Sequence, residues 1–248
     1  MTHDNKPTSK PLPKTSTLAN MQQWRCPKQG TSAPHNDHLH LGTVITEHVP
    51  WFNHASSQCR SQHGTQIDAT CGLFAVNHIL AAVYYTSHGP AHFLSRQAFE
   101  HAALQAHLGD ASYNLIQPGA ANYDWAVLHT NFNLRNLYTT PLAPEDLETH
   151  ADAVFSPPTV QHTAPTRGYV LRTPQAGGHW IALLPATAMA PIQLPTNTAA
   201  ILCDSLQTVP FALSAGDVEQ LLLTAAVAQL EAHENRLDWA VFAITTEF

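Results

Sequence analysis

Residues of the types that perform nucleophilic catalysis stand in this sequence where a catalytic site would need them. Cys71 opens a run, residues 72–85, whose apolar side chains recur at the i, i+3, i+4, i+7 spacing of a helix face. At a helix start the backbone N–H groups point at the cysteine sulfur, and the positive end of the helix dipole favours the thiolate. Cys71 is therefore a candidate nucleophile. The plainer interpretation, a small hydrophobic residue buried under a helix, also stays open.

A thiol nucleophile needs a base, and the base needs an orienting group. His179 starts the predicted strand 179–185, and Asp204 ends the next predicted strand. Adjacent antiparallel strands put the start of one beside the end of the other, so we expect His179 and Asp204 to be neighbours. Asp204 would then accept the Nδ1–H of the imidazole and fix its tautomer, while the other ring nitrogen faces Cys71.

Further residues are expected to serve the same reaction. Gln66, on the loop five residues before Cys71, can donate its side-chain amide to a developing oxyanion. Gly177 and Gly178 precede His179 and let the backbone approach a substrate closely. Trp180 is expected to pack beside them, so the expected substrate-binding residues are Gly177, Gly178 and Trp180.

The other cysteines are weaker candidates. Cys59 has no predicted helix to lie on, and Cys203 points away from Asp204 by strand alternation, which suggests a structural role. The four cysteines are widely spaced, without a CxxC pair, and the N-terminus is polar, without the apolar core that directs export. We expect a soluble protein with free thiols, cytoplasmic or nuclear, in a reducing compartment.

The elements that must position these residues change in type along the chain. Ser214 and Asp217 have capping-box spacing and open the clearest helix. Helices precede an antiparallel meander, which indicates an α+β fold. The predicted helices are 72–85, 95–109, 117–133 and 214–235, with a short one at 144–151, and the predicted strands are 41–49, 134–140, 167–173, 179–185, 200–206 and 239–248.

Composition divides the chain at about residue 48. Residues 1–48 are expected to form a flexible tail, because most of that stretch is rich in Pro, Thr, Ser and Lys without periodicity, and 49–248 to form one domain. After residue 28 there is no lysine, and six arginines face seventeen acidic residues, which argues against nucleic acid as a partner. The apolar run 221–230 is too short to cross a membrane, so none is expected as a partner.

A metal or cofactor is not expected either. Four histidines in the segment 35–52 raise the question of a metal site, but no cysteine or carboxylate completes a ligand set. No motif for a cofactor was found in the sequence.

The pattern Gln-x4-Cys, then His-Trp on a strand, then Asp-Ser-Leu resembles the Josephin deubiquitinases, which are papain-like cysteine proteases. The resemblance covers about residues 60–246 and includes the stretches CGLFAVNHIL, NYDWAVLHTNF, GGHWIAL and CDSL. It implies a Josephin-like fold, with a helical half packed on an antiparallel sheet and a helical hairpin near 85–118. It also implies cleavage after the C-terminal glycine of ubiquitin or a ubiquitin-like protein. The catalytic residues that it implies are Cys71, His179, Asp204 and Gln66.

Departures from the family pattern leave alternatives open. His78 stands where the family often has a second asparagine, and the loop between His179 and Asp204 is longer than usual. One alternative is a papain-like cysteine protease with a non-ubiquitin substrate, for example in polyprotein processing. The other is a catalytically idle module that binds ubiquitin.

Overall fold

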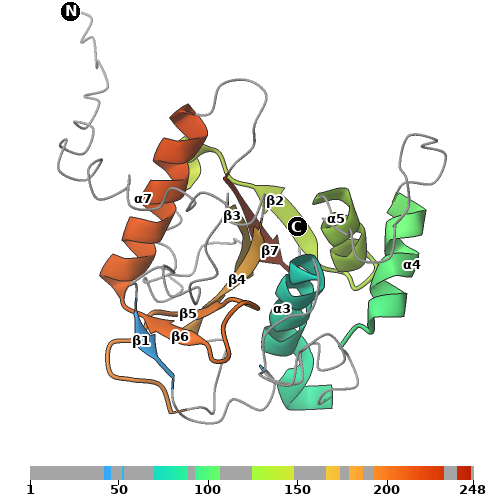
Figure 1. Ribbon diagram of the computed structural model, residues 1–248, viewed down its shortest axis with the longest axis horizontal. Coiled ribbons are helices and arrows are strands. Elements are labelled where there is room, and N and C mark those ends of the chain that lie inside the picture. Colours follow the sequence, from blue (N-terminus) through green and yellow to red (C-terminus); the bar gives the residue numbers. More distant parts are fainter. Residues whose placement is uncertain are drawn as a thin grey trace, which may run out of the picture. The chain divides into compact units, whose positions relative to one another are not determined.

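An antiparallel sheet of seven strands lies at the centre of the part of the chain described by this computed structural model (Figure 1). The strand order is β1-β6-β5-β4-β3-β7-β2, so β4, which begins with His179, lies in the middle. The strands are Thr43–Val44 (β1), Tyr138–Pro141 (β2), Thr166–Thr173 (β3), His179–Pro185 (β4), Ala200–Cys203 (β5), Phe211–Leu213 (β6) and Ala240–Thr245 (β7).

The structure describes residues 42–45, 52, 70–88, 93–106, 125–147, 166–173, 179–186, 193–231 and 239–246. The chain divides into two units, Met1–His40 and Leu41–Phe248, and all described residues belong to the second. Gln66, Gly177 and Gly178 lie outside the described residues, as does most of the predicted tail, 1–48.

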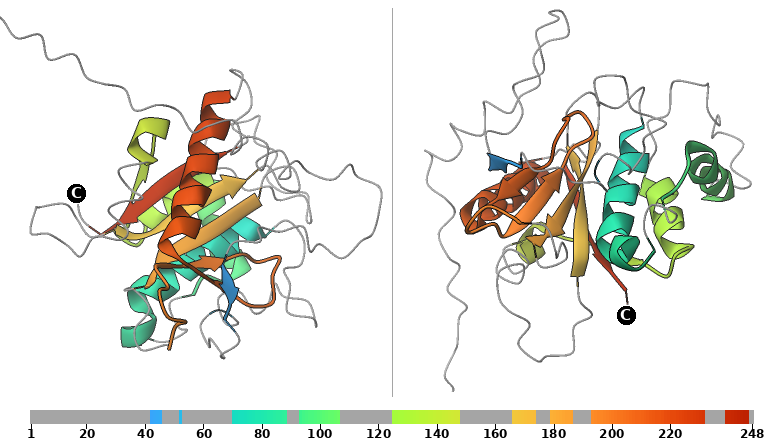
Figure 2. Two further views of the ribbon diagram at one scale, coloured as in Figure 1. Left: turned by 90° about the vertical axis from the view of Figure 1, so that its left-hand side faces the viewer. Right: turned by 90° about the horizontal axis from the view of Figure 1, so that it is seen from below.

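Helices cover both faces of the sheet. Figure 2 shows α7 against one face and α3 and α5 against the other, with α4 on the outer side of α5. The arrangement is a mixed α and β fold built on an antiparallel sheet, as the sequence predicts. The helices are Cys71–His88 (α3), Arg96–Ala106 (α4), Trp125–Asn133 (α5) and Ala215–Glu231 (α7), with one further helical turn at 144–147.

Strand β4 is buried along nearly its whole length. Its residues from His179 to Leu184 are all buried, because successive side chains point to opposite faces and both faces are covered. Trp180, Ala182 and Leu184 join the core that also contains α3 and α5 residues. The catalytic candidate His179 is therefore attached to a buried central strand.

The helix starts follow their sequence signals. Ser214 and Asp217 form the predicted capping box of α7: the Ser214 backbone N–H donates to Asp217 Oδ2 at 2.8 Å, and the Asp217 N–H donates to Ser214 Oγ at 3.3 Å. Helix α3 is predicted by its apolar spacing and is buried from Cys71 to Ala81 without interruption.

Some boundaries differ from those predicted. Strand β1 falls inside the range 1–48 that was assigned to the tail, yet it pairs with β6, and Ile45 after it is 2% exposed. At least Thr43–Ile45 therefore belongs to the sheet. Strand β6 was not predicted, because a three-residue strand after a turn has no measurable periodicity. Strand β5 ends at Cys203 rather than at residue 206, because Asp204 begins a turn.

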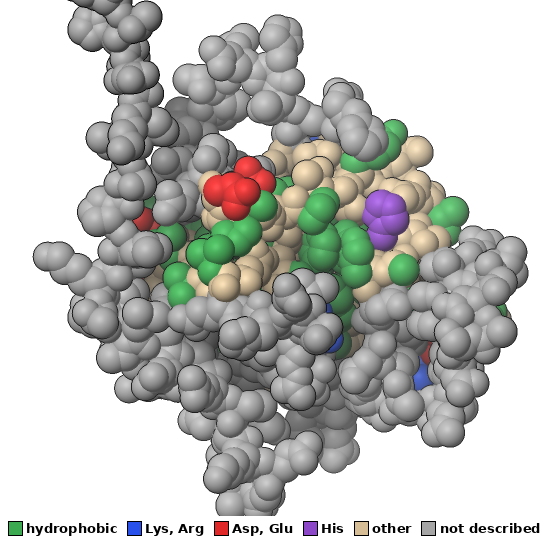
Figure 3. Space-filling view, turned by 90° about the horizontal axis from the view of Figure 1, so that it is seen from above, with side chains coloured by type: hydrophobic (Ala, Val, Ile, Leu, Met, Phe, Trp, Pro, Cys, Tyr) green, Lys and Arg blue, Asp and Glu red, His purple; other side chains and the backbone are tan. Residues whose placement is uncertain are grey.

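Charged residues make up 12% of the chain. On the face seen from above in Figure 1, the described residues present mainly hydrophobic side chains, uncharged polar side chains and backbone, together with a patch of Asp and Glu and a His side chain, while Lys and Arg are visible only as small separate areas (Figure 3).

Candidate active site

Cys71 is the first residue of α3, as the sequence predicts. The helical hydrogen bonds begin one residue earlier, where the carbonyl of Thr70 accepts the N–H of Phe74 at 3.2 Å. The first N–H groups of an α-helix have no carbonyl partner in their own helix, so those of the first turn can donate to negative charge at its start. Cys71 is a free thiol and is 4% exposed.

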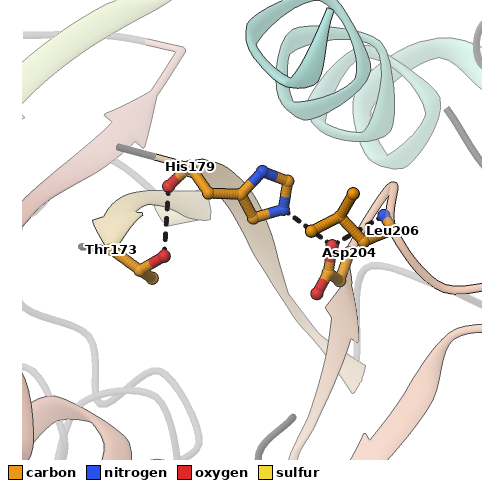
Figure 4. A network of polar contacts seen from close by, with 4 residues as sticks. All are labelled: Thr173, His179, Asp204 and Leu206. Carbon is orange, nitrogen blue, oxygen red and sulfur yellow. Dashed lines mark hydrogen bonds and ion pairs between the residues drawn. The ribbon is translucent and has the colours of Figure 1, made fainter. Parts of the chain in front are cut away.

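His179 and Asp204 are joined by a hydrogen bond between buried side chains. His179 Nε2 lies 2.7 Å from Asp204 Oδ1, and the two side chains are 2% and 4% exposed (Figure 4). The pairing of the two strands brings these residues close together: the last pair of β4 and β5 is Ala182 with Cys203, and Asp204 follows directly after it. His179, three residues before Ala182, lies at the start of β4, at the same end of the strand pair as Asp204.

Asp204 is itself held in place by the turn that follows β5. Its Oδ1 accepts the backbone N–H of Leu206 at 2.8 Å, and its carbonyl accepts the N–H of Gln207 at 3.0 Å. An aspartate that bonds to the backbone two residues ahead is a common turn-forming device. Here the same oxygen also takes the histidine, so the turn orients the carboxylate toward the ring.

The backbone at His179 is supported from the other side by β3. Thr173 is the cross-strand partner of His179, and its hydroxyl donates to the His179 carbonyl at 3.4 Å (Figure 4). Both residues are buried. Thr173 was not singled out from the sequence, because a threonine at a strand end carries no motif.

The orientation of the imidazole corrects one prediction. The sequence predicts that Nδ1 faces Asp204, but the nitrogen that faces Asp204 is Nε2. Nδ1 lies on the opposite side of the ring in Figure 4, and the ring also makes a hydrogen-bonding contact with Cys71. Asp204 Oδ1 is held by the turn at Leu206, and the ring presents its Nε2 to that oxygen.

The pKa of His179 reflects its burial and its two neighbours. Burial by itself lowers the pKa of His179, but the charge and hydrogen bond of Asp204, together with the contact to Cys71, raise it to about 10. The imidazole is therefore protonated at neutral pH, with a carboxylate on one side and a sulfur on the other. Because all three residues are buried, these attractions are screened little by water.

Trp180 is not at the surface. It is 4% exposed, and its ring lies 6.0 Å from that of Trp125 and 6.2 Å from that of Phe242 between centroids. Arg172 lies across the strand pair, with its guanidinium carbon 6.0 Å from the Trp180 ring centroid. The Trp180 ring therefore supports the start of β4 from within the core. Almost none of its surface is exposed, so it has little area with which to contact a substrate as predicted.

The remaining cysteine of the sheet behaves as expected. Cys203 is buried in the core cluster that contains Cys71, and it is a free thiol. Strand alternation separates it from the side of β5 on which Asp204 meets the histidine.

In comparisons with known proteins, no protein-family model and no curated protein matches the chain. In the part of the chain that the structure describes, no helix could span a membrane, and no group of three His, Cys, Asp or Glu residues could hold a metal ion. A function must therefore be argued from the geometry of Cys71, His179 and Asp204.

Proposed function

We propose that this chain is a thiol-dependent isopeptidase of the Josephin type, a papain-like cysteine protease. Its substrate would be a protein joined to the C-terminal glycine of ubiquitin or of a ubiquitin-like modifier. One observation carries the proposal: a cysteine at the start of a buried helix is in hydrogen-bonding contact with a histidine, and Nε2 of that histidine is bonded to an aspartate. A nucleophile, a proton carrier and an orienting group in contact are the requirements of thiol catalysis.

The first half-reaction follows from the protonated imidazole. Its positive charge stabilises the thiolate of Cys71, which attacks the carbonyl carbon of the terminal glycine of the modifier. The C–N bond to the lysine amine breaks, and the proton on Nδ1 of His179 passes to the departing nitrogen. The products are the free amine and a thioester between Cys71 and the modifier.

The second half-reaction restores the enzyme. His179 is neutral after giving up its proton, so Nδ1 can accept a proton from water while the water oxygen attacks the thioester carbonyl. The C–S bond breaks, which releases the modifier with a free carboxylate. Asp204 stays ionised throughout, because its role is to hold Nε2–H and to stabilise the imidazolium.

The remaining catalytic assignments complete the proposal. Gln66 would donate to the oxyanion beside the backbone N–H of Cys71, and Gly177 and Gly178 would line the narrow channel for a Gly-Gly tail. The buried ion pair supports an enzyme over an idle binding module, since binding alone does not require a protonated histidine held in contact with a sulfur.

The deciding experiment is labelling by ubiquitin that carries an electrophile at its C-terminus. The expected product is one covalent adduct at Cys71, identified by mass spectrometry of the peptides. Cys71→Ala should abolish labelling. Cys203→Ala is the matched control, because it removes another buried free thiol from the same core and should leave labelling intact.

Other outcomes would assign other functions. If the folded protein stays unlabelled but cleaves members of a peptide library, a papain-like protease with a non-ubiquitin substrate replaces the proposal. If it binds ubiquitin, and iodoacetamide modifies Cys71 no faster than a free thiol, a binding module replaces it.

A further inference from the structure

His179 lies at an end of the sheet where two strands stop together. Strand β3 ends at Thr173, β4 begins at His179, and these two residues form the last pair of that ladder. On the other side of β4, the pairing with β5 starts at Ala182. The strand neighbour of the His179 backbone is therefore Thr173. Because strand ends open more easily than strand centres, this end needs contacts of its own.

The Thr173 side chain makes such a contact. Its hydroxyl donates to the carbonyl of His179 at 3.4 Å, and both residues are 2% exposed (Figure 4). Threonine and valine have nearly the same shape and both suit a strand, so valine would fill this buried position equally well. The hydroxyl is thus the part of Thr173 that packing does not require, and a buried hydroxyl without a bond is costly.

The two contacts hold different parts of His179. Thr173 holds the backbone carbonyl, while Asp204 holds the ring at Nε2, at 2.7 Å. A ring that is fixed at its main chain and at one nitrogen has a fixed direction for its other nitrogen. In the proposed mechanism Nδ1 carries the proton that moves between Cys71, the leaving amine and water.

We infer that Thr173 is a positioning residue for this proton transfer, whose hydroxyl fixes the backbone of His179 so that Nδ1 stays directed toward Cys71. The role in turnover rests on the proposed function. The bond is long, since O–H···O distances are usually about 2.5–3.0 Å, so it adds little to the stability of the fold. Catalysis is more sensitive, because a shift of about 1 Å in a catalytic group lowers a rate by about 100-fold.

Two substitutions separate the hydroxyl from the shape of the residue. Thr173→Val removes the hydroxyl, and Thr173→Ser keeps it but removes a methyl group. With ubiquitin-coumarin, we expect kcat about 10-fold lower in the valine variant and within about 2-fold of the unmodified protein in the serine variant. KM should stay constant, because Thr173 is buried away from substrate. The urea midpoints should rank in the opposite order, since only serine loses a buried methyl group.

The ring of His179 supplies a second measurement, which space filling alone would not change. Its pKa is read from the ¹⁵N NMR shifts of the imidazole nitrogens, and His179→Gln identifies the signals by their absence. In Thr173→Val this pKa should fall, because the contacts with Asp204 and Cys71 that raise it become weaker. In Thr173→Ser it should match that of the unmodified protein.

Thr224→Val is the matched control. Thr224 is also a buried threonine, and its hydroxyl donates to the carbonyl of Gln220 at 2.7 Å within α7. The chemical change is the same, but the bond that is lost stays inside one helix. This variant should keep kcat and the pKa of His179.

The results that overturn the inference differ from those that overturn the proposed function. Full activity in Thr173→Val, or a serine variant as slow as the valine variant, would show that the hydroxyl has no positioning role. So would a loss of kcat in the valine variant with an unchanged pKa of His179. If the unmodified protein neither hydrolyses ubiquitin-coumarin nor is labelled by the ubiquitin electrophile, the proposed function fails. The NMR measurement then still decides whether Thr173 positions the ring.

Discussion

Asp204 Oδ1 accepts a hydrogen bond from His179 Nε2 at 2.7 Å while it also accepts the backbone N–H of Leu206 at 2.8 Å. Asp204 Oδ1 thus links the first residue of the central strand β4 to the turn that follows the neighbouring strand β5. If the carboxylate turned away from the ring, it would also lose its hydrogen bond to the Leu206 N–H. In the proposed mechanism, this link is what keeps Nδ1 directed toward Cys71.

Replacing Asp204 by Asn should keep the geometry and remove the charge. The amide oxygen can still accept both N–H groups, so the fold should persist, but the imidazolium loses its counter-ion. We expect kcat with a ubiquitin-coumarin substrate to fall by about 10²–10⁴-fold. The alkaline limb of the pH–activity profile should move to lower pH, because the Asp204 charge raises the pKa of His179. An unmoved limb would show that another group controls it.

The raised pKa of His179 predicts a pH-dependent stability. The ordinary pKa is 6.5 and the folded value is about 10, so between them the folded state holds a proton that the unfolded chain has released. The stabilisation is fully present below pH 6.5 and is lost as the pH rises through about 10. Urea unfolding at pH 6, 8 and 10, compared with His179→Gln, should show the variant losing less stability over this range. Parallel curves would contradict the prediction.

Gln66→Ala tests the oxyanion assignment, which rests on sequence and resemblance. If Gln66 donates to the oxyanion, kcat should fall by about 10²–10³-fold with little change in KM, since the bond forms only as negative charge develops. Gln62→Ala, four residues earlier in the sequence, is the control and should retain activity. A loss confined to KM would assign Gln66 to substrate binding instead.

Trp180 is expected to matter for stability rather than for substrate contact. Trp180→Ala should lower the free energy of unfolding by about 3–5 kcal/mol, because it leaves a cavity beside Trp125 and Phe242. Trp180→Phe retains most of that packing and should keep KM for ubiquitin-coumarin within about 2-fold. A large rise in KM in the well-folded Phe variant would restore the original assignment to substrate binding.

Gly42→Ala should detach β1 from the sheet. Gly42 has φ of +87°, and a Cβ there would collide with the carbonyl of Ala212 on β6. We expect a loss of about 1–3 kcal/mol in the free energy of unfolding. Gly216→Ala is the control: Gly216 lies in the first turn of α7 with open space around it, so the same change should be neutral or stabilising there. Equal effects at the two sites would argue against a special backbone at Gly42.

Much of this molecule is determined by local sequence. The apolar residues that follow Cys71 at helical spacing predict α3. A buried helix needs apolar side chains at that spacing whichever elements it packs against. The Ser214–Asp217 spacing predicts the start of α7, since a capping box is completed within four residues. The order of the strands starting at His179 and ending near Asp204 predicts that the two residues meet, because antiparallel neighbours leave few other arrangements.

Other features were decided only by tertiary structure. Which nitrogen of His179 faces Asp204 depends on how the folded chain places the start of β4 against the turn at Leu206, and residue spacing does not encode that placement. Strands β1 and β6 exist because they pair with each other and with β5, since two or three residues have no stable extended form alone. From the sequence alone, Asn77 is predicted only to be a residue of helix α3. Its bonds to Leu94 arise because the folded chain brings a residue seventeen positions away against it, and a contact of that range is fixed by packing rather than by local preference.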